Sequence, residues 1–412
     1  MELKYENLSD ELSKQLEKDF ASRPLTDGAV NNEDIIRRNS YSKDKGSVWR
    51  PPFVQDIDKI MHCPYYNRYA DKTQVFSFFR NDDISRRGYH VQLVARIARN
   101  IGNVLGLNES LIEAIALGHD IGHTPFGHAG ERILNKIYNE KTGRYFNHNV
   151  HSVRVLDKIF SRNISLQTLD GIICHNGEFV EQEYRPHGLK DFDEFDRMLE
   201  NCYTDKNNIK KLVPSTLEGC VVRICDMIAY IGKDRQDALQ TNMFDTTPLF
   251  SELSIGTTNA EMINNLSVNI IENSYGKDYI YLDNQYYEDI KKAKKENYEK
   301  IYFNEKIECK YNKVIEPMFW EIYEKLYNDL ISGNEESVIF RHHMNFVREN
   351  EKYYDKDFNY QNEEPAQIVA DYIASMTDDY FIDLYSYLFP NGKFTGEKNG
   401  IKYIGYFEQD CK

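Results

Sequence analysis

Between residues 118 and 131 the chain reads Gly118-His119-Asp120-Ile121-Gly122-His123-Thr124-Pro125-Phe126-Gly127-His128-Ala129-Gly130-Glu131. This stretch combines three histidines, one aspartate and one glutamate with four glycines and one proline. The adjacent His119 and Asp120 offer a neutral nitrogen and an anionic oxygen, and both bind divalent ions. A polar turn after a helix would explain the glycines, but it needs no such density of metal- and proton-binding side chains. We therefore predict a metal or acid–base site here.

The composition around this stretch is that of a globular chain. Of its 412 residues, 41% are hydrophobic and 28% are charged, and this length predicts two or three domains or one large domain with insertions. We expect no transmembrane helix, because no run approaches ~18 apolar residues. The N-terminal segment has no apolar core, so we expect no secretory signal. The seven cysteines form no CxxC pattern, which fits free thiols in the cytoplasm.

The net charge of −15 argues against a general electrostatic attraction to nucleic acid. A polyanionic ligand would therefore require local cations, either an arginine or lysine cluster or a metal ion. Six of the eleven histidines fall between residues 90 and 151. Histidine is the commonest metal ligand and titrates near neutral pH, so this clustering also indicates a site.

Apolar periodicity predicts a mainly α fold with a small β addition. We expect helices over residues 90–105, from the N-cap Asn108 to His119, and over 150–162, 216–239, 285–300 and 316–332. Residues 171–183 should form a connection, and residues 393–407 a β-hairpin that turns at Asn399-Gly400. We divide the chain into an N-terminal lead-in (1–50), a core (51–240) and a mostly helical C-terminal region (241–412).

His90 and Arg87 form a second candidate group. His90 lies on the apolar face of its predicted helix, where a lone histidine is more often a core residue. Arg87 lies one turn earlier on the same face. An arginine binds phosphate oxygens through its planar fork, so an anion bound between these two side chains would explain the pair.

Asp226 lies in the middle of an apolar helical run and should be buried. A buried carboxylate is costly unless it is paired or binds a metal. The alternative is an ion pair with a core arginine such as Arg223. Because Asp226, Tyr230 and Asp234 follow at intervals of four residues, one helix face offers two carboxylates and a phenol.

Taken together, these segments supply two imidazoles and two carboxylates for one ion, from His90, His119, Asp120 and Asp226. This donor set suits Mg, Mn, Fe or Zn and leaves the identity of the ion open. It also leaves positions for water and substrate, as catalytic metal sites do.

The order His, His-Asp, Asp resembles the signature of the HD metal-dependent phosphohydrolases. The fuller pattern is similar to the bacterial dGTPase-like branch, the deoxynucleoside triphosphate triphosphohydrolases. The motifs that carry this resemblance lie at residues 50–60, 72–76, 87–90, 118–131, 146–149, 169–178 and 226–230, with a further echo at 376–378. The match is strong over roughly residues 48–240 and faint beyond. It implies an HD-domain helical core with a helical C-terminal extension.

The resemblance implies hydrolysis of dGTP or another dNTP to a deoxynucleoside and inorganic triphosphate. The divalent ion would be held by His90, His119, Asp120 and Asp226. Among the implied catalytic residues, His128, steered by Glu131, would protonate the leaving 5′ oxygen, and His123 would line the phosphate path. The implied substrate contacts are Arg87 at the α-phosphate, His148 on the phosphate path, and Gln74, Tyr230 and Asp234 at the sugar.

Two positions depart from the family pattern. Leu93 stands where a glutamate is common, and Lys233 stands where a histidine is often found. Neither removes a metal ligand, but both bear on base preference and phosphate contacts.

Two other functions stay open. One is an HD-type phosphohydrolase or phosphodiesterase that acts on another nucleotide. The other is a regulator that binds nucleotides or single-stranded DNA on an HD scaffold. The resemblance also implies a cytoplasmic homo-oligomer built from dimers, up to a hexamer, without a membrane partner. Binding of an allosteric nucleotide or of single-stranded DNA at a subunit junction is a further hypothesis.

Overall fold

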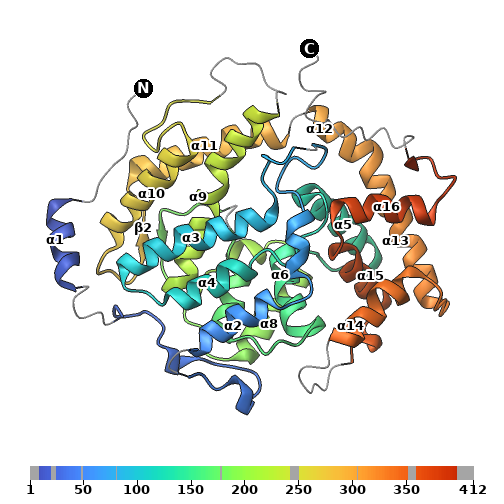
Figure 1. The fold of residues 1–412 in the computed structure, drawn as a ribbon, viewed down its shortest axis with the longest axis horizontal. Coiled ribbons are helices and arrows are strands. Elements are labelled where there is room, and N and C mark those ends of the chain that lie inside the picture. Colours follow the sequence, from blue (N-terminus) through green and yellow to red (C-terminus); the bar gives the residue numbers. More distant parts are fainter. Residues whose placement is uncertain are drawn as a thin grey trace.

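The structure is a computed structural model. It describes residues 9–19, 25–47, 50–79, 81–176, 179–241, 250–303, 305–350 and 359–396. Helices dominate these ranges, which confirms the mainly α prediction (Figure 1). The helices of the first half are α1 (Asp10–Asp19), α2 (Pro52–Met61), α3 (Arg87–Leu105), α4 (Glu109–Gly118), α5 (Gly127–Thr142), α6 (His148–Arg154), α7 (Leu166–Ile173), α8 (Phe192–Thr204) and α9 (Leu217–Gln240).

The second half is also helical. It contains α10 (Asn259–Ser274), α11 (Asn284–Asn297), α12 (Glu305–Lys310), α13 (Glu316–Ile331), α14 (Asn345–Asn350), α15 (Pro365–Ala374) and α16 (Asp378–Leu388). Within the described ranges the only strands are β1 (Glu183–Tyr184) and β2 (Ile280–Tyr281), which pair antiparallel with Tyr184 opposite Ile280.

Most predicted helices are found, with shifted ends. The side chain of Asn108 accepts hydrogen bonds from the amides of Ser110 and Leu111, which confirms it as the N-cap of α4. The helix predicted over 150–162 begins earlier, as α6, and continues only as a short π-helix over Val155–Ile159. Residues 171–173, predicted as part of a connection, are instead the last turn of α7, where apolar side chains continue the helical face.

The predicted C-terminal hairpin is not tested by the structure. Its turn at Asn399-Gly400 lies outside the described residues. Residues 393–396, which would begin its first strand, are in turn and 3₁₀ conformation.

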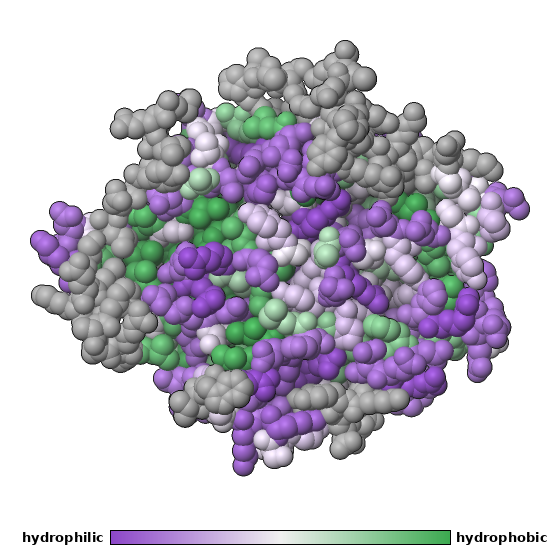
Figure 2. All heavy atoms as spheres, in the orientation of Figure 1, coloured by the Kyte–Doolittle hydropathy of each residue, from purple (hydrophilic) through white to green (hydrophobic). Residues whose placement is uncertain are grey.

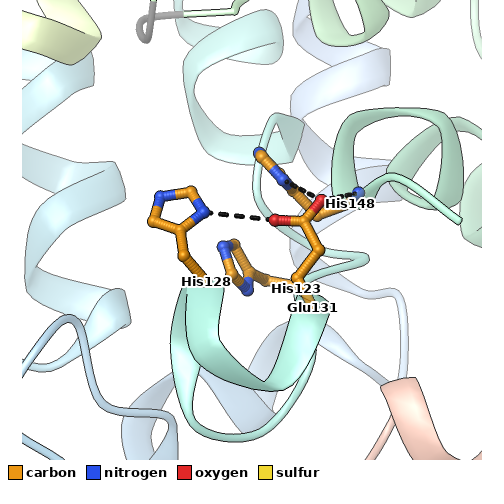
Figure 3. Close-up of side chains that lie close together, drawn as sticks. All are labelled: His123, His128, Glu131 and His148. Carbon is orange, nitrogen blue, oxygen red and sulfur yellow. Dashed lines mark hydrogen bonds and ion pairs between the residues drawn. The ribbon is translucent and has the colours of Figure 1, made fainter. Parts of the chain in front are cut away.

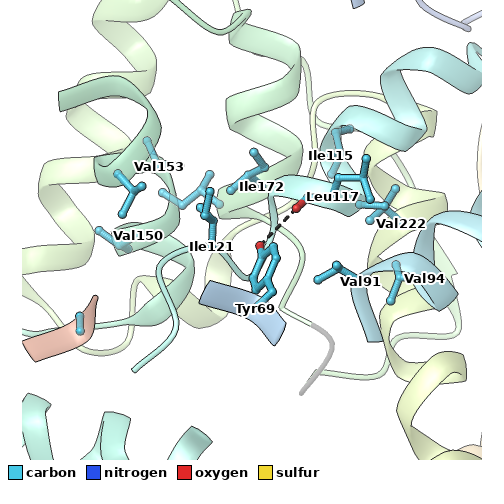
Figure 4. Close-up of a cluster of buried hydrophobic side chains, with 14 of the residues drawn as sticks. Tyr69, Val91, Val94, Ile115, Leu117, Ile121, Val150, Val153, Ile172 and Val222 are labelled. Carbon is cyan, nitrogen blue, oxygen red and sulfur yellow. Dashed lines mark hydrogen bonds between the residues drawn. The ribbon is translucent and has the colours of Figure 1, made fainter. Parts of the chain in front are cut away.

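One apolar core holds the helices that carry the candidate residues (Figure 4). It lies where α3 and α4 pack against each other and against α9, with α6 and α7 alongside. Its labelled members are Tyr69, Val91, Val94, Ile115, Leu117, Ile121, Val150, Val153, Ile172 and Val222. The Tyr69 hydroxyl donates to the Leu117 carbonyl at 3.2 Å, so this buried phenol is satisfied beside the end of α4. The core thus fixes the start of α3, the end of α4 and the middle of α9, from which His90, His119 and Asp226 project.

The C-terminal helices α13 to α16 gather at one side of the molecule (right in Figure 1), where α13 and α15 pack on α5. Polar bonds tie them to the 118–131 stretch. The buried Lys72 ammonium donates to the carbonyls of His123 and Ala374. The carboxylate of Asp378 accepts from the Phe126 amide at 2.9 Å and from the Thr73 hydroxyl at 2.6 Å.

The chain reverses between His123 and His128 through two residues in the left-handed region. Phe126 has a φ of 61° and Gly127 a φ of 54°. A bulky residue in this region costs about 1–3 kcal/mol, so the surroundings must enforce it. The Phe126 ring is buried and lies edge-on to Phe381, with centroids 5.3 Å apart, and its amide is held by Asp378. This turn points both histidines toward one cavity.

We expect Gly122→Ala to destabilise the protein by about 1–3 kcal/mol through overpacking. A Cβ atom at Gly122 would lie 2.2 Å from the Ser152 amide nitrogen and 2.4 Å from the His151 carbonyl carbon, and these backbone atoms cannot move aside easily. Thermal unfolding measures the effect. Gly188→Ala is the matched control, because a Cβ there meets nothing within 4 Å. Equal melting temperatures for the two variants would contradict the close approach of this turn to α6.

Among the described residues, no helix combines the length and apolar character needed to cross a membrane. The face shown in Figure 2 carries hydrophilic side chains interleaved with smaller apolar patches.

Candidate metal and phosphate site

A cavity of about 440 Å³ lies between the core and the C-terminal region. This volume is in the usual range for small-molecule sites. Of the twelve residues predicted for the site, eleven line it: Gln74, Arg87, His90, Asp120, His123, His128, Glu131, His148, Asp226, Tyr230 and Asp234. The twelfth, His119, is fully buried and contacts two of them, Asp120 and Asp226. Segments far apart in the sequence therefore meet in one place.

His90, His119 and Asp226 form a group able to hold a metal ion, with one ligand atom from each within 4.8 Å of the others. His90 Nε2 lies 2.9 Å and His119 Nε2 3.7 Å from the same Asp226 oxygen. Asp120 joins from the side, with an oxygen 3.5 Å from His119 Nε2. The four predicted ligands thus converge from α3, α9 and the turn after α4.

The protonation state of the His119 ring is the one that a metal ligand requires. Its Nδ1 donates to the Ala116 carbonyl at 2.7 Å, which fixes the proton on Nδ1 and leaves a lone pair on Nε2. That Nε2 is buried and has no hydrogen-bond partner within the described chain. A buried, unsatisfied nitrogen is costly, and coordination to a cation removes the cost.

The alternative for Asp226, an ion pair with Arg223, is wrong. Arg223 donates to the Leu212 carbonyl at 2.6 Å and to Glu181 at 3.1 Å. Burial alone would raise the pKa of Asp226, but the hydrogen bond from His90 and the neighbouring His119 outweigh it and lower the pKa to about 2. The carboxylate is therefore anionic at neutral pH.

Arg87 is buried and donates to Asp120. Burial opposes ionisation of Asp120, but the guanidinium and the surrounding histidines outweigh it and hold the pKa of this carboxyl well below its usual range. Because Arg87 also lines the cavity, its positive charge lies between the metal-binding group and the rest of the site. An anionic ligand in the cavity would meet this charge.

A second group lies beside the first and consists of His123, His128, Glu131 and His148; we call it the histidine cluster (Figure 3). The Glu131 carboxylate accepts from His128 Nδ1 at 3.1 Å and from His148 Nδ1 at 2.8 Å. Burial would raise the pKa of Glu131, yet His148 and His128 together hold it well below its usual range. One carboxylate therefore orients two imidazoles.

His123 lies next to this carboxylate, with its ring stacked on that of His148 at a centroid distance of 4.5 Å. Burial, followed by the charge of Arg87, holds the pKa of His123 well below its usual range. At neutral pH this imidazole is therefore uncharged.

The sugar-side candidates Gln74, Tyr230 and Asp234 line the same cavity. The Tyr302 hydroxyl donates to Asp234 at 2.5 Å, which links this end of the cavity to the C-terminal region. The two departures from the family pattern, Leu93 and Lys233, do not line the cavity. Lys233 is held by Asp237 at 2.6 Å instead.

Sequence reasoning missed His175. Its Nε2 lies 3.1 Å from His148 Nε2, and together with His119 and Asp120 it forms a further group of ligand atoms within 4.8 Å of one another. Burial lowers the pKa of His175 to about 3, so it is neutral. The available signal was its position in the motif at residues 169–178, to which we assigned no site residue.

Other lining residues had no local signal in the sequence. They come from the loop before α9 and from the C-terminal region: Lys206, Ile209, Lys210, Tyr298, Ile301, Tyr302, Phe303 and Tyr311. Only the folded chain brings them to the cavity.

We expect Asp234→Asn to gain stability relative to the wild type as the pH rises from 5 to 8. Burial raises the pKa of Asp234 to about 7, although the Tyr302 hydroxyl lowers it in part. An unfolded aspartate has a pKa of about 3.9, so between these two values the folded state binds the proton more tightly. The free energy of unfolding of the wild type therefore falls through this window, by at most about 1.4 kcal/mol per pH unit, and levels off above pH 7.

Urea unfolding at pH 5 and pH 8, in the presence of a chelator, measures this difference. The exposed Asp193→Asn is the control. A stability gap between wild type and Asp234→Asn that is the same at both pH values would contradict the raised pKa.

Comparison with known proteins agrees with this geometry. The HD domain family matches residues 87–230, and the phosphohydrolase-associated domain matches residues 301–387. A deoxyguanosinetriphosphate triphosphohydrolase-like protein of Caldanaerobacter subterraneus subsp. tengcongensis is 34% identical over 349 residues, which cover 82% of this chain and 85% of the relative. Proteins of the same description from Clostridium tetani and Pelagibacter ubique are 32% and 31% identical, over 82% and 83% of this chain and 86% and 94% of theirs.

The chain belongs to the deoxyguanosinetriphosphate triphosphohydrolase-like family. It is thus a member of a family of HD-type phosphohydrolases, whose HD domains are metal-dependent. The HD match begins at Arg87 and ends at Tyr230, so it contains the metal-binding group and the histidine cluster. The phosphohydrolase-associated match shows that the family resemblance, which we described as faint beyond residue 240, continues through α13 to α16.

Proposed function

We propose that this protein hydrolyses a deoxynucleoside triphosphate, dGTP or another dNTP, to a deoxynucleoside and inorganic triphosphate in a metal-dependent reaction. The observation that carries the proposal is the shared cavity, in which a metal-binding group, a buried arginine and a carboxylate-oriented histidine line one volume. The printed names of the relatives support the substrate class.

The ion, whether Mg, Mn, Fe or Zn, would be held by His90, His119, Asp120 and Asp226. When bound, such an ion lowers the pKa of water and neutralises phosphate charge. The low pKa of both carboxyls keeps them anionic for this purpose. Arg87, which donates to Asp120 and to the Thr73 carbonyl, would present its positive charge to the α-phosphate.

His128 would donate a proton to the leaving 5′ oxygen. An alkoxide is a poor leaving group, so a positioned acid contributes about 10²–10⁴-fold. Glu131 orients His128 by accepting a hydrogen bond from its Nδ1 at 3.1 Å. His123 and His148, neighbours in the same cluster, would line the triphosphate path.

At the other end of the cavity, Gln74, Tyr230 and Asp234 would contact the sugar. The side-chain oxygen of Gln74, Oε1, is buried without a hydrogen-bond partner in the described chain. A hydroxyl or amide group of a ligand would satisfy it by donating a hydrogen bond. A close wall at C2′ would exclude ribonucleotides. The domain division at residue 240, the homo-oligomer and the allosteric nucleotide or single-stranded DNA stay predictions.

Product analysis tests the proposal. The protein is incubated with each dNTP and with GTP, singly and mixed, in Mg²⁺ or Mn²⁺, and the phosphorus product is identified. We expect inorganic triphosphate and a deoxynucleoside from at least one dNTP and no reaction with GTP. Release of orthophosphate or pyrophosphate would assign a different HD-type reaction, and binding without turnover in any mixture would favour the regulator.

A further inference from the structure

We propose that the histidine cluster is a second transition-metal site, which binds Zn²⁺ and thereby blocks the acid function of His128. This inference rests on the proposed function only for its inhibitory consequence. The cluster is separate from the group of His90, His119 and Asp226, and one ligand atom from each of its four residues lies within 4.8 Å of the others. Figure 3 shows the four side chains converging around the Glu131 carboxylate.

His123 is the residue that points to a ligand. It is fully buried, and neither of its ring nitrogens has a hydrogen-bond partner within the described chain. Leaving a buried polar group unsatisfied costs about 1–3 kcal/mol. Since a ligand atom of His123 lies within 4.8 Å of those of His128, Glu131 and His148, a cation bound among these atoms would satisfy the nitrogen.

The distances between the four ligand atoms are compatible with a bound Zn²⁺ ion. A Zn²⁺ ion lies about 2.0–2.2 Å from each ligand atom, which in a tetrahedral site spaces the ligands about 3.3 Å apart. The four ligand atoms must therefore move inward by about an ångström at most. His128 is able to move, because 51% of its side chain is exposed. The protons now shared between Glu131 and its two imidazole partners would be released to solvent when the ion binds.

The donor set selects the kind of ion. Three imidazoles and one carboxylate suit Zn²⁺ and its transition-metal neighbours. Mg²⁺ prefers oxygen ligands and keeps its waters, so it is a poor ion for this cluster. The four predicted ligands of the first ion include two carboxylates, whereas the histidine cluster has one, so the cluster is the site that better distinguishes Zn²⁺ from Mg²⁺.

The consequence is inhibition. With one ring nitrogen bound to Zn²⁺, His128 cannot become the doubly protonated imidazolium, and its remaining N–H is a much weaker acid for the leaving oxygen. We therefore expect Zn²⁺ beyond the first equivalent to reduce turnover at least tenfold in protein whose first site is filled, while the same excess of Mg²⁺ has no such effect.

Equilibrium dialysis against Zn²⁺, followed by metal analysis, counts the sites without substrate. We expect two ions per chain in the wild type, and one in His128→Gln, whose half-exposed side chain makes misfolding an unsatisfactory explanation. Asp226→Asn, which damages only the first group, should also hold one. His342→Gln, an exposed histidine outside the cavity, should hold two and corrects for adventitious surface binding.

One Zn²⁺ in the wild type, or equal counts in the wild type and His128→Gln, would overturn the second site. The two proposals fail separately. Loss of the triphosphate product would refute the proposed function and leave the metal counts unchanged, whereas a single zinc site would leave the product analysis unchanged.

Discussion

We expect the Asp226→Ala variant to lose metal retention and turnover together. Its carboxylate is the one group that both His90 and His119 approach, at 2.9 and 3.7 Å. Removing it takes away a charged ligand and leaves Asp120, which lies near His119, as the remaining carboxylate of the predicted ligand set. No other described carboxylate bonds to His90, so the ion loses its link between α3 and α9.

Metal content after dialysis in Mn²⁺, together with the product assay, measures both losses. The control is Cys225→Ala, which changes the adjacent buried residue of α9 without touching the cavity lining. Full retention of one Mn²⁺ ion by Asp226→Ala would contradict the ligand assignment. A drop in both variants would indicate damage to the core.

We expect His128→Ala to keep one Mn²⁺ ion per chain and to lose about 10²–10⁴-fold in kcat, the contribution of a general acid. The stability should change little, because the side chain is half exposed and its main partner, Glu131, keeps its bonds to His148. Metal content and kcat are measured at one equivalent of Mn²⁺.

Arg132→Ala is a matched control on the next turn of α5, since Arg132 also lines the cavity but pairs with Glu308 at 2.7 Å. We expect it to change KM more than kcat. If His128→Ala lost as much metal as Asp226→Ala, the acid assignment would be wrong.

Local sequence patterns were sufficient to predict the helices and the candidate residues within them. The four-residue spacing of Asp226, Tyr230 and Asp234 correctly placed three side chains on one face, because α9 is regular over that length. The N-cap at Asn108 was predictable for the same reason, since the signal and the structure lie within three residues.

What could not be predicted depends on distant contacts. The left-handed conformation of Phe126 is enforced by Asp378, which lies 252 residues away in the sequence. Tyr302 donates to Asp234 from a π-helical turn, Tyr298–Tyr302, which the sequence pattern did not predict. His175 was overlooked because helical periodicity does not predict the direction of a side chain in a turn. The packing of α7 against α6 brings it to His148.

The bonds made by Lys72 and Asp378 have a consequence for how this molecule can be divided. Both side chains fasten the backbone around His123 and Phe126 to the last helices of the chain. A fragment that stops near residue 240 would therefore retain the four candidate metal ligands, but Lys72 would lose its bond to Ala374 and the turn at Phe126 its bond to Asp378. We expect the minimal autonomous unit to be larger than the segment that contains the candidate residues, and insertions or truncations near α15 and α16 to disturb His123 and His128.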